Sequence, residues 1–193
     1  DGLSSDVAVK TLAAGYGKLR DGRNDVLVIV GDGTATRSAR LSATFTWAKN
    51  AAHMIGISSG VSISNRSRIA PTAGVAAFRN FFTISGSGCL FANIAWFQGF
   101  TTGTTAQIAL TVSGGRNKFI GCHIAGMGDA ASAADAGSRC LLLTGNTGEN
   151  EFLECTIGID TLARSMANAN VGFAVNSARN RSCCERVWVT IAS

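Results

Sequence analysis

Proline, charge and long apolar runs are all scarce in this 193-residue sequence, and each shortage excludes a class of structure. Pro71 is the only proline, which suits a fold whose strands all need their backbone N–H groups. Charged residues make up 15% of the chain and hydrophobic residues 46%, a balance that is too apolar for a disordered chain. No apolar run reaches the roughly 18 residues of a membrane span, so no membrane partner is expected.

Clusters of metal-binding or basic side chains are also missing from the sequence. The six cysteines and two histidines never stand at zinc-ligand spacing, so we expect no metal and no cofactor. The net charge of +5 is mild and the arginines are scattered. Direct nucleic-acid binding calls for a denser basic stripe with interleaved aromatics, and it is therefore not expected.

Acidic residues are too dispersed to predict an enzyme. Glycoside hydrolysis usually needs two carboxylates about 5–10 Å apart. The candidates are Glu151, Glu154, Glu185, Asp129, Asp135 and Asp160. Aligned by repeat, Glu154 matches Gly121 and Glu185 matches Cys155, so no acidic column forms. We assign no catalytic residue, and a polysaccharide lyase or glycoside hydrolase stays open as a minor alternative.

What the sequence does contain is a repeat. The segment Asn117–Ile124 matches Asn150–Ile157 at an offset of 33, sharing Asn, Phe, an aliphatic residue, Cys and Ile in register. A third copy leads through Asn180 to Val187, a fourth runs from Phe82 to Ile94, and a fainter fifth covers His53–Ile57. Each copy holds short β-rich pieces separated by Gly, Asn and Ser turns, and none is long enough to close its own core.

Stacking solves this problem, because each coil pairs its strands with the coils above and below. We therefore predict an all-β fold, a right-handed parallel β-helix of about five coils. Equivalent residues should lie on top of one another and form a structural ladder. Its expected members are Asn117, Asn150 and Asn180 at a tight bend, Phe119 over Phe152, and Cys122 over Cys155. An Asn at such a bend can adopt a left-handed backbone and bond its amide to the next coil.

The variable offsets predict longer loops on one side of the solenoid. These loops are Ser58–Asn80, Gln98–Ala106, Ala125–Ser138 and Gly158–Asn170. Insertions in a solenoid gather on its binding face, so Ser58–Asn80 and Ala125–Ser138 are the predicted partner surfaces.

The N-terminal part reads differently from the repeats. Ser5 and Asp6 can cap a short helix over Val7–Lys18, and a buried strand follows from Asp25. We expect residues 1–24 to form a capping helix and lead-in, and residues 25–193 to form the β-helix. The missing initiator Met and the strand-like final run Val187–Ile191 suggest part of a longer chain.

Two runs resemble β-helix virion proteins of tailed bacteriophages. One is Thr46–Ile57 followed by Ser64–Ile69, and the other is Cys155–Ser165. The similarity extends from about Asp25 to Val187 and carries no assigned chemistry. The resemblance implies a structural protein associated with the phage head exterior, with a decoration or cementing role. Its implied partners are the major capsid protein or other virion proteins, and a homo-oligomer, with a trimer possible.

Related β-helices also occur in tail spikes, which bind or cleave surface glycans, so this alternative stays open. It predicts an exposed groove in which aromatics such as Trp96, Phe97 or Trp188 lie beside acids. The competing interpretation places Trp96 in the core and Phe97 on the flank of one strand.

Overall fold

We describe the chain from a computed structural model. It describes residues 4, 7–31, 39–57, 67–72, 79–98, 106–126, 137–145, 148–158, 171–176, 182–185 and 188–189. Over the last three of these ranges the backbone is described and the side chains are not.

Strands from successive parts of the chain form three sheets. Sheet A consists of β1 (Val26–Val30), β4 (His53–Ile57), β7 (Leu90–Ala92), β10 (Lys118–Ile120), β13 (Asn150–Leu153) and β16 (Ser182–Glu185). Sheet B consists of β2 (Ala39–Leu41), β5 (Arg68–Pro71), β8 (Ala95–Phe97), β11 (His123–Ala125), β14 (Thr156–Ile157) and β17 (Trp188–Val189). Sheet C consists of β3 (Phe45–Trp47), β6 (Asn80–Ile84), β9 (Ile108–Val112), β12 (Arg139–Thr144) and β15 (Val171–Asn176).

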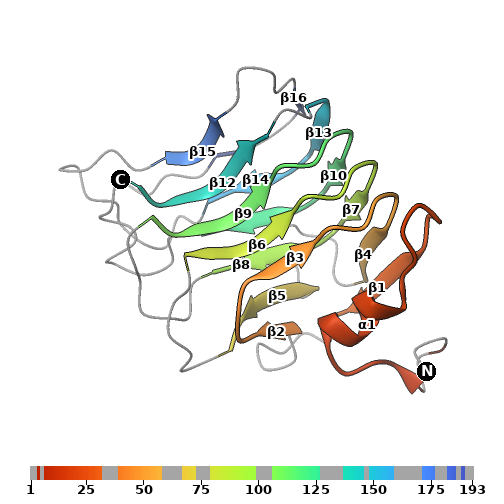
Figure 1. The fold of residues 1–193 in the computed structure, drawn as a ribbon. Coiled ribbons are helices and arrows are strands. Elements are labelled where there is room, and N and C mark those ends of the chain that lie inside the picture. Colours follow the sequence, from red (N-terminus) through yellow and green to blue (C-terminus); the bar gives the residue numbers. More distant parts are fainter. Residues whose placement is uncertain are drawn as a thin grey trace.

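Every neighbouring pair of strands in these sheets is parallel, and each coil contributes one strand to each sheet in turn. The predicted parallel β-helix is thus confirmed. The coil count differs from the prediction, because the sheets hold six, six and five strands. An additional first coil, β1 to β3, precedes the copy at His53 (Figure 1).

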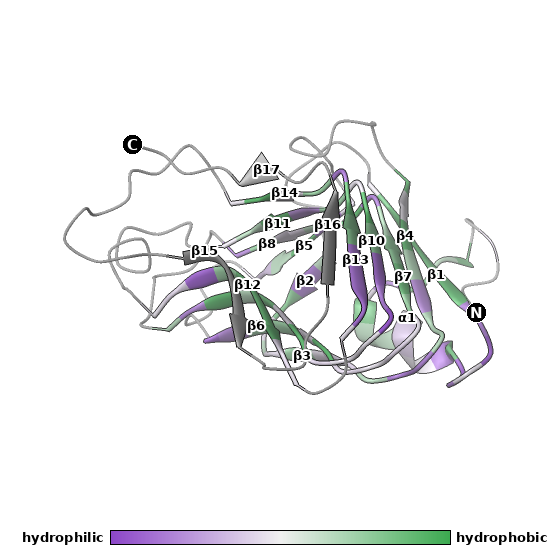
Figure 2. Cartoon of the chain, turned by 90° about the horizontal axis from the view of Figure 1, so that it is seen from above, coloured by the Kyte–Doolittle hydropathy of each residue, from purple (hydrophilic) through white to green (hydrophobic). Residues whose placement is uncertain are grey.

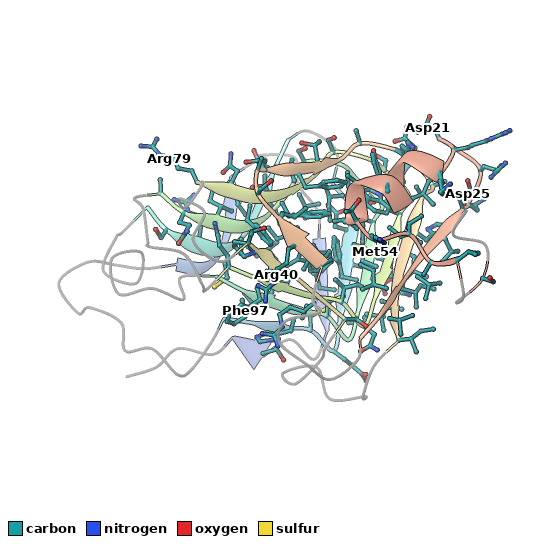
Figure 3. The ribbon with its side chains drawn as sticks, turned by 90° about the horizontal axis from the view of Figure 1, so that it is seen from below. Asp21, Asp25, Arg40, Met54, Arg79 and Phe97 are labelled. Atoms are coloured by element: carbon teal, nitrogen blue, oxygen red, sulfur yellow. The ribbon has the colours of Figure 1, made fainter. Side chains whose placement is uncertain are left out.

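The interior is filled by columns of aliphatic and aromatic side chains. Strand alternation turns every second residue inward, so register partners stack on one another inside the solenoid. Phe45 stacks on Phe82 with ring centroids 5.3 Å apart, and Trp47 meets Phe91 edge to face at 5.7 Å. Met54 is fully buried and points into this interior (Figure 3). Three walls of strands surround the core when the molecule is viewed from above (Figure 2).

The N-terminal helix is shorter than the sequence suggested. Helix α1 spans Leu12–Lys18, and its N-cap is Thr11, whose hydroxyl accepts a hydrogen bond from the Ala14 N–H at 3.1 Å. The predicted start at Val7 is wrong, because an extended Thr11 caps the helix four residues later. The predicted cap residues Ser5 and Asp6 lie outside the described residues. The helix lies beside the first coil, at the opposite end of the solenoid from β15 and β16 (Figure 1).

One predicted loop contains a strand. The range Ser58–Asn80 includes β5, which pairs with β2 and β8 in sheet B. The prediction of an uninterrupted loop there is wrong, because every coil needs a sheet B strand to continue the stack. The central parts of the other three predicted loops, residues 99–105, 127–136 and 159–170, lie outside the described residues.

Candidate interaction surface

Asn117 and Asn150 hold the corner that leads into sheet A. The Asn150 side-chain oxygen accepts a hydrogen bond from the Asn117 backbone N–H at 3.0 Å, and the Asn117 oxygen accepts from the Cys89 N–H at 2.9 Å. Their amide groups donate to carbonyls of other coils, Asn117 to Gly86 at 3.0 Å and Asn150 to Gly114 at 3.1 Å. Both residues are 1% exposed, so these bonds satisfy groups that water does not reach.

Two details of this ladder differ from the prediction. The left-handed residue is the one before the asparagine, since Arg116 and Glu149 have φ of 57° and 66°. The register of β13 with β16 pairs Asn150 with Ser182. Asn180 itself lies outside the described residues, and the ladder position falls two residues after it. The same register pairs Leu153 with Glu185, so the expected match of Glu185 with Cys155 is wrong.

Phenylalanines form a continuous column behind sheet A. Phe119 lies over Phe152 with ring centroids 4.4 Å apart and planes 3° apart, and over Phe91 at 5.1 Å. All three are fully buried. Aromatic stacking of this kind adds to the stabilisation from burial and favours this register of successive coils.

Cys122 and Cys155 occupy equivalent corners of two successive coils and are both fully buried. The Cys122 thiol donates to the Phe91 carbonyl at 3.4 Å, and the Cys155 thiol donates to the Leu153 carbonyl at 3.3 Å. Burial raises the pKa of the Cys122 thiol well above its ordinary value. Cys89 and Cys140 are likewise buried thiols outside any disulfide, so these four thiols act as packing groups.

Two of the candidate acids, Glu151 and Glu154, have side chains that the structure describes. Glu151 is paired with Lys118 at 2.9 Å, and Glu154 is exposed at a corner with φ of 52°. Glu185 is described by its backbone alone, and Asp129, Asp135 and Asp160 lie outside the described residues.

The two histidines bond across coils. His53 accepts a hydrogen bond from the Leu90 N–H through Nδ1 at 3.0 Å, so its Nε2 carries the proton and donates to the Asn24 side-chain oxygen at 3.1 Å. His123 is 5% exposed, and its Nε2 lies 2.9 Å from the Gly158 carbonyl. Both rings are thereby fixed between neighbouring coils.

The predicted glycan-binding aromatics are separated by the fold. Trp96 is fully buried in the core, where it contacts Phe82, Phe91 and Phe119. Phe97 is half-buried on the outer side of sheet B, near Arg40, and the Arg68 guanidinium lies 5.1 Å from its ring centroid (Figure 3). The third candidate, Trp188, is described only by its backbone.

The outer face of sheet A is unusually apolar for a solvent-facing sheet. Its central column consists of Val28, Ile55, Ala92, Ile120 and Leu153, which follow one another in register. Every residue of this column keeps part of its surface exposed. Parallel sheets are normally covered on both faces, so a face of this composition indicates a contact surface. The sequence pattern did not reveal this surface, because the apolar run Val26–Val30 does not distinguish inward from outward positions.

The apolar character is greatest in the first two coils. Val26, Val28 and Val30 are 47%, 48% and 68% exposed on β1, and Ile57 is 57% exposed on β4. Strand β1 is coloured as hydrophobic along its whole length in Figure 2. We call the apolar outward side chains of these two strands the β1–β4 patch, defined by Val26, Val28, Val30, Ile55 and Ile57. His53, the register partner of Val26, is the polar residue at the edge of this patch. Further along the face, Lys118 and Glu151 add an ion pair whose side chains are 43% and 39% exposed.

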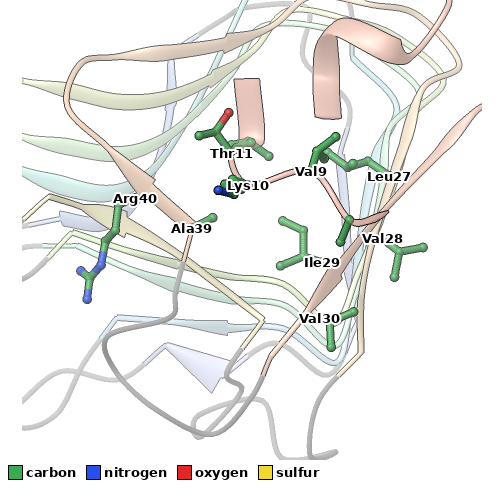
Figure 4. Close-up of a pocket in the computed structure, with 11 residues that line it drawn as sticks. Val9, Lys10, Thr11, Leu27, Val28, Ile29, Val30, Ala39 and Arg40 are labelled. Carbon is green, nitrogen blue, oxygen red and sulfur yellow. The ribbon is translucent and has the colours of Figure 1, made fainter. Parts of the chain in front are cut away.

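A cleft of about 370 Å³ opens at the N-terminal end of the solenoid, between the segment before α1 and the first coil. Val9, Leu27, Ile29 and Ala39 give it an apolar lining, with Lys10 among them (Figure 4). Arg40 and Val28 also border the cleft, but their side chains point away from it (Figure 4).

Within the described residues, no group of three His, Cys, Asp or Glu side chains could hold a metal ion. No helix in the same residues is long and apolar enough to cross a bilayer. No protein-family model, curated protein or solved structure matches the chain.

Proposed function

We propose that this chain is a structural protein that works by adhesion to other proteins, as a component of a bacteriophage particle on the head exterior. The observation that carries the proposal is the apolar outer face of sheet A. A rigid solenoid presents this face on regular strands, and contiguous apolar faces that are exposed on a protein surface mark contacts with other proteins. The resemblance of Thr46–Ile57, Ser64–Ile69 and Cys155–Ser165 to phage β-helix proteins supports the assignment to a phage particle.

The mechanism is mechanical. The stacked Phe column and the buried Asn117–Asn150 bonds keep the coils in register, so the outer side chains are held in fixed positions. A preorganised surface loses little conformational freedom when it binds, which favours adhesion. The partners are the major capsid protein or other virion proteins. The right-handed winding is part of this proposal, because parallel crossover connections are right-handed in about 98% of cases.

The test is to add purified chain to phage heads that lack it, and to locate it by electron microscopy. We expect bound density on the outside of the head. Ile120→Lys with Leu153→Lys places two charges on the outer face of sheet A and should abolish binding. Thr46→Lys with Thr83→Lys adds the same charge on the outer side of sheet C and should leave binding unchanged.

A tail location or glycan chemistry would overturn the proposal. Particle images with density on the tail, binding on a glycan array, or release of reducing ends from bacterial polysaccharide would each assign the chain to the tail-spike class.

A further inference from the structure

We propose that the β1–β4 patch is the contact between two copies of this chain, packed face to face around a two-fold axis. The inference rests on the adhesive function proposed above and names a partner for one part of the same face. It starts from the exposure of Val26, Val28, Val30 and Ile57, which together form the apolar end of sheet A.

The first argument is the absence of charge. No member of the β1–β4 patch is charged, so the complementary surface must itself be apolar and must not bring a buried charge. The part of sheet A formed by the later coils carries the charged residues Lys118 and Glu151 at outward positions, so it is less suited to an apolar contact. A second copy of the patch meets the requirement, because apolar burial has no direction and an apolar face complements itself.

The second argument is shape. β1 and β4 pair in register over five residues, from Val26 with His53 to Val30 with Ile57. Their outward side chains therefore stand in rows with the spacing of the sheet, about 4.8 Å between strands. Two identical sets of rows can interdigitate, and sheets that pack this way lie about 10 Å apart. An isologous contact uses the same surface on both copies, which is the commonest arrangement in soluble dimers.

The third argument is area. Six strands of three to five residues, with a rise of about 3.3 Å per residue and about 4.8 Å between strands, give the whole outer face of sheet A about 380 Å². A standard stable interface buries about 800 Å² on each partner. The patch covers only the first part of that face, so we expect a weak dimer that forms at micromolar or higher concentration and dissociates on dilution.

The experiment is sedimentation velocity of the full chain over a concentration series. We expect a reversible monomer–dimer equilibrium. Val28→Lys with Ile57→Lys should weaken dimerisation by at least about thirty-fold, the loss expected from removing a central contact. Both side chains are about half exposed, so these changes leave the core intact, which the circular dichroism spectrum checks. The matched control is Thr46→Lys with Thr83→Lys, which should dimerise like the parent chain.

Salt gives an independent readout. Two copies with a net charge of +5 repel each other, and salt screens that repulsion. An apolar dimer should therefore strengthen at 0.5 M NaCl, whereas a contact held by ion pairs should weaken. A short bismaleimide should also cross-link Val28→Cys chains to dimers, and should cross-link Thr46→Cys chains no more than the parent.

A parent chain that stays monomeric at about 100 μM, or a dimer that both lysine pairs weaken equally, would overturn this inference. A dimer that ion-pair screening dissolves would do the same. A chain that is monomeric yet binds phage heads would leave the proposed function standing. The opposite result separates the two proposals as well. If the parent chain dimerises, Val28→Lys with Ile57→Lys abolishes the dimer, and the parent does not bind heads, the dimer contact stands and the proposed function fails.

Discussion

Asn117 holds the corner between sheets C and A through buried side-chain hydrogen bonds. Its side chain accepts from Cys89 and donates to Gly86, both in the preceding coil, and all of these atoms are shielded from water. Asn117→Ala leaves a buried N–H and a buried carbonyl without partners, each at about 1–3 kcal/mol. We expect the free energy of unfolding to fall by about 2–4 kcal/mol in a urea titration followed by circular dichroism.

The neighbouring residue provides the control for that change. Arg116 has a left-handed backbone, and its side chain is 79% exposed in an ion pair with Glu149. Arg116→Ala should cost no more than about 1 kcal/mol, because exposed ion pairs contribute little. If the two variants lose equal stability, the amide bonds of Asn117 are not what holds the corner.

Cys122 makes the free energy of unfolding depend on pH in the alkaline range. Burial raises the pKa of its thiol, so the thiol stays protonated in the folded chain while it ionises in the unfolded chain above about pH 8.5. The unfolded state then binds fewer protons, and stability falls as pH rises. Its contribution is fully present below that pH and is lost at up to about 1.4 kcal/mol per pH unit above it.

The measurement is the free energy of unfolding between pH 7 and 10, under reducing conditions. Cys155 is hydrogen-bonded to Cys122 and titrates together with it, so the variant must remove both thiols. Cys122→Ala with Cys155→Ala should be less stable at pH 7, because it removes two buried side chains, but its stability should decline less steeply with pH. A variant as steep as the parent would show that other groups cause the alkaline loss.

At the scale of single residues, the sequence predicted which residues stack on one another better than it predicted where the turn residues lie. Shared register was enough to place Phe119 against Phe152, because an aromatic at the same inward position of two coils has nowhere else to stack. It did not locate the left-handed residue, because Arg116 and Glu149 are neither Gly nor Asn. It also aligned Asn180 two residues from the ladder position, where the chain has Ser182 instead.

Helix α1 is a lid on the first coil, and Tyr16 is the residue that attaches it. The Tyr16 ring packs against Phe45 at 5.3 Å and Trp47 at 4.8 Å, and its hydroxyl accepts from the Ala48 N–H at 2.9 Å. The Lys49 ammonium lies 4.5 Å from the same ring centroid and donates to the Tyr16 and Leu19 carbonyls. These contacts cover aromatic core that the end of a solenoid would otherwise expose.

We expect Tyr16→Ala to lower the free energy of unfolding by about 2–4 kcal/mol, as for other aromatic truncations, and to increase binding of a hydrophobic dye. Gly17→Ala makes a control of opposite sign. A Cβ at Gly17 meets nothing within 4 Å, and Ala favours a helix over Gly by about 1 kcal/mol. Dye binding that is unchanged in Tyr16→Ala would show that the helix does not seal the core.

Elements with a strong pattern were predictable and those defined by their neighbours were not. The repeated Asn-x-Phe segments predicted the strands β10 and β13. In contrast, β5 has four residues and ends at the only proline, so its pairing with β2 and β8 decides that it is a strand. The helix start was misplaced because Ser5 and Asp6 rank above Thr11 as N-cap residues by residue type, although Thr11 caps the helix.

At the scale of the whole molecule, the fold is a stack in which each coil depends on its neighbours. The sequence predicted that arrangement because like residues recur about thirty positions apart. It missed the first coil, since Val26–Val30 shares neither the Phe nor the Cys of the repeat. β4 pairs Met54 with Phe91, an offset of 37 residues that differs from the offset of 33 between Asn117–Ile124 and Asn150–Ile157. Length variation in the loops hides such register shifts until strand pairing fixes them.

Stacking makes a coil removable only as a whole unit. Residues 118–150 correspond to one full repeat, because Lys118 pairs with Glu151 and Asn117 bonds to Asn150. Deleting them joins Asn117 to Glu151 and returns Phe152 to the place of Phe119, over Phe91. We expect the shortened chain to fold, with a parallel β-helix spectrum and a urea m-value lower by about one sixth, since m follows the surface buried.

Deleting residues 118–151 removes one residue more and is the matched control. It joins Asn117 to Phe152, so the phenylalanine takes the outward position of Lys118 and every later side chain in the strand reverses its face. Leu153 would then take the inward place of Phe119 over Phe91, and charged Glu154 would move from the corner to the strand position of Ile120. This variant should not fold cooperatively in a urea titration. Two deletions of equal stability would show that the coils are not held by the inward columns, and the stacked-column account of this protein would fail.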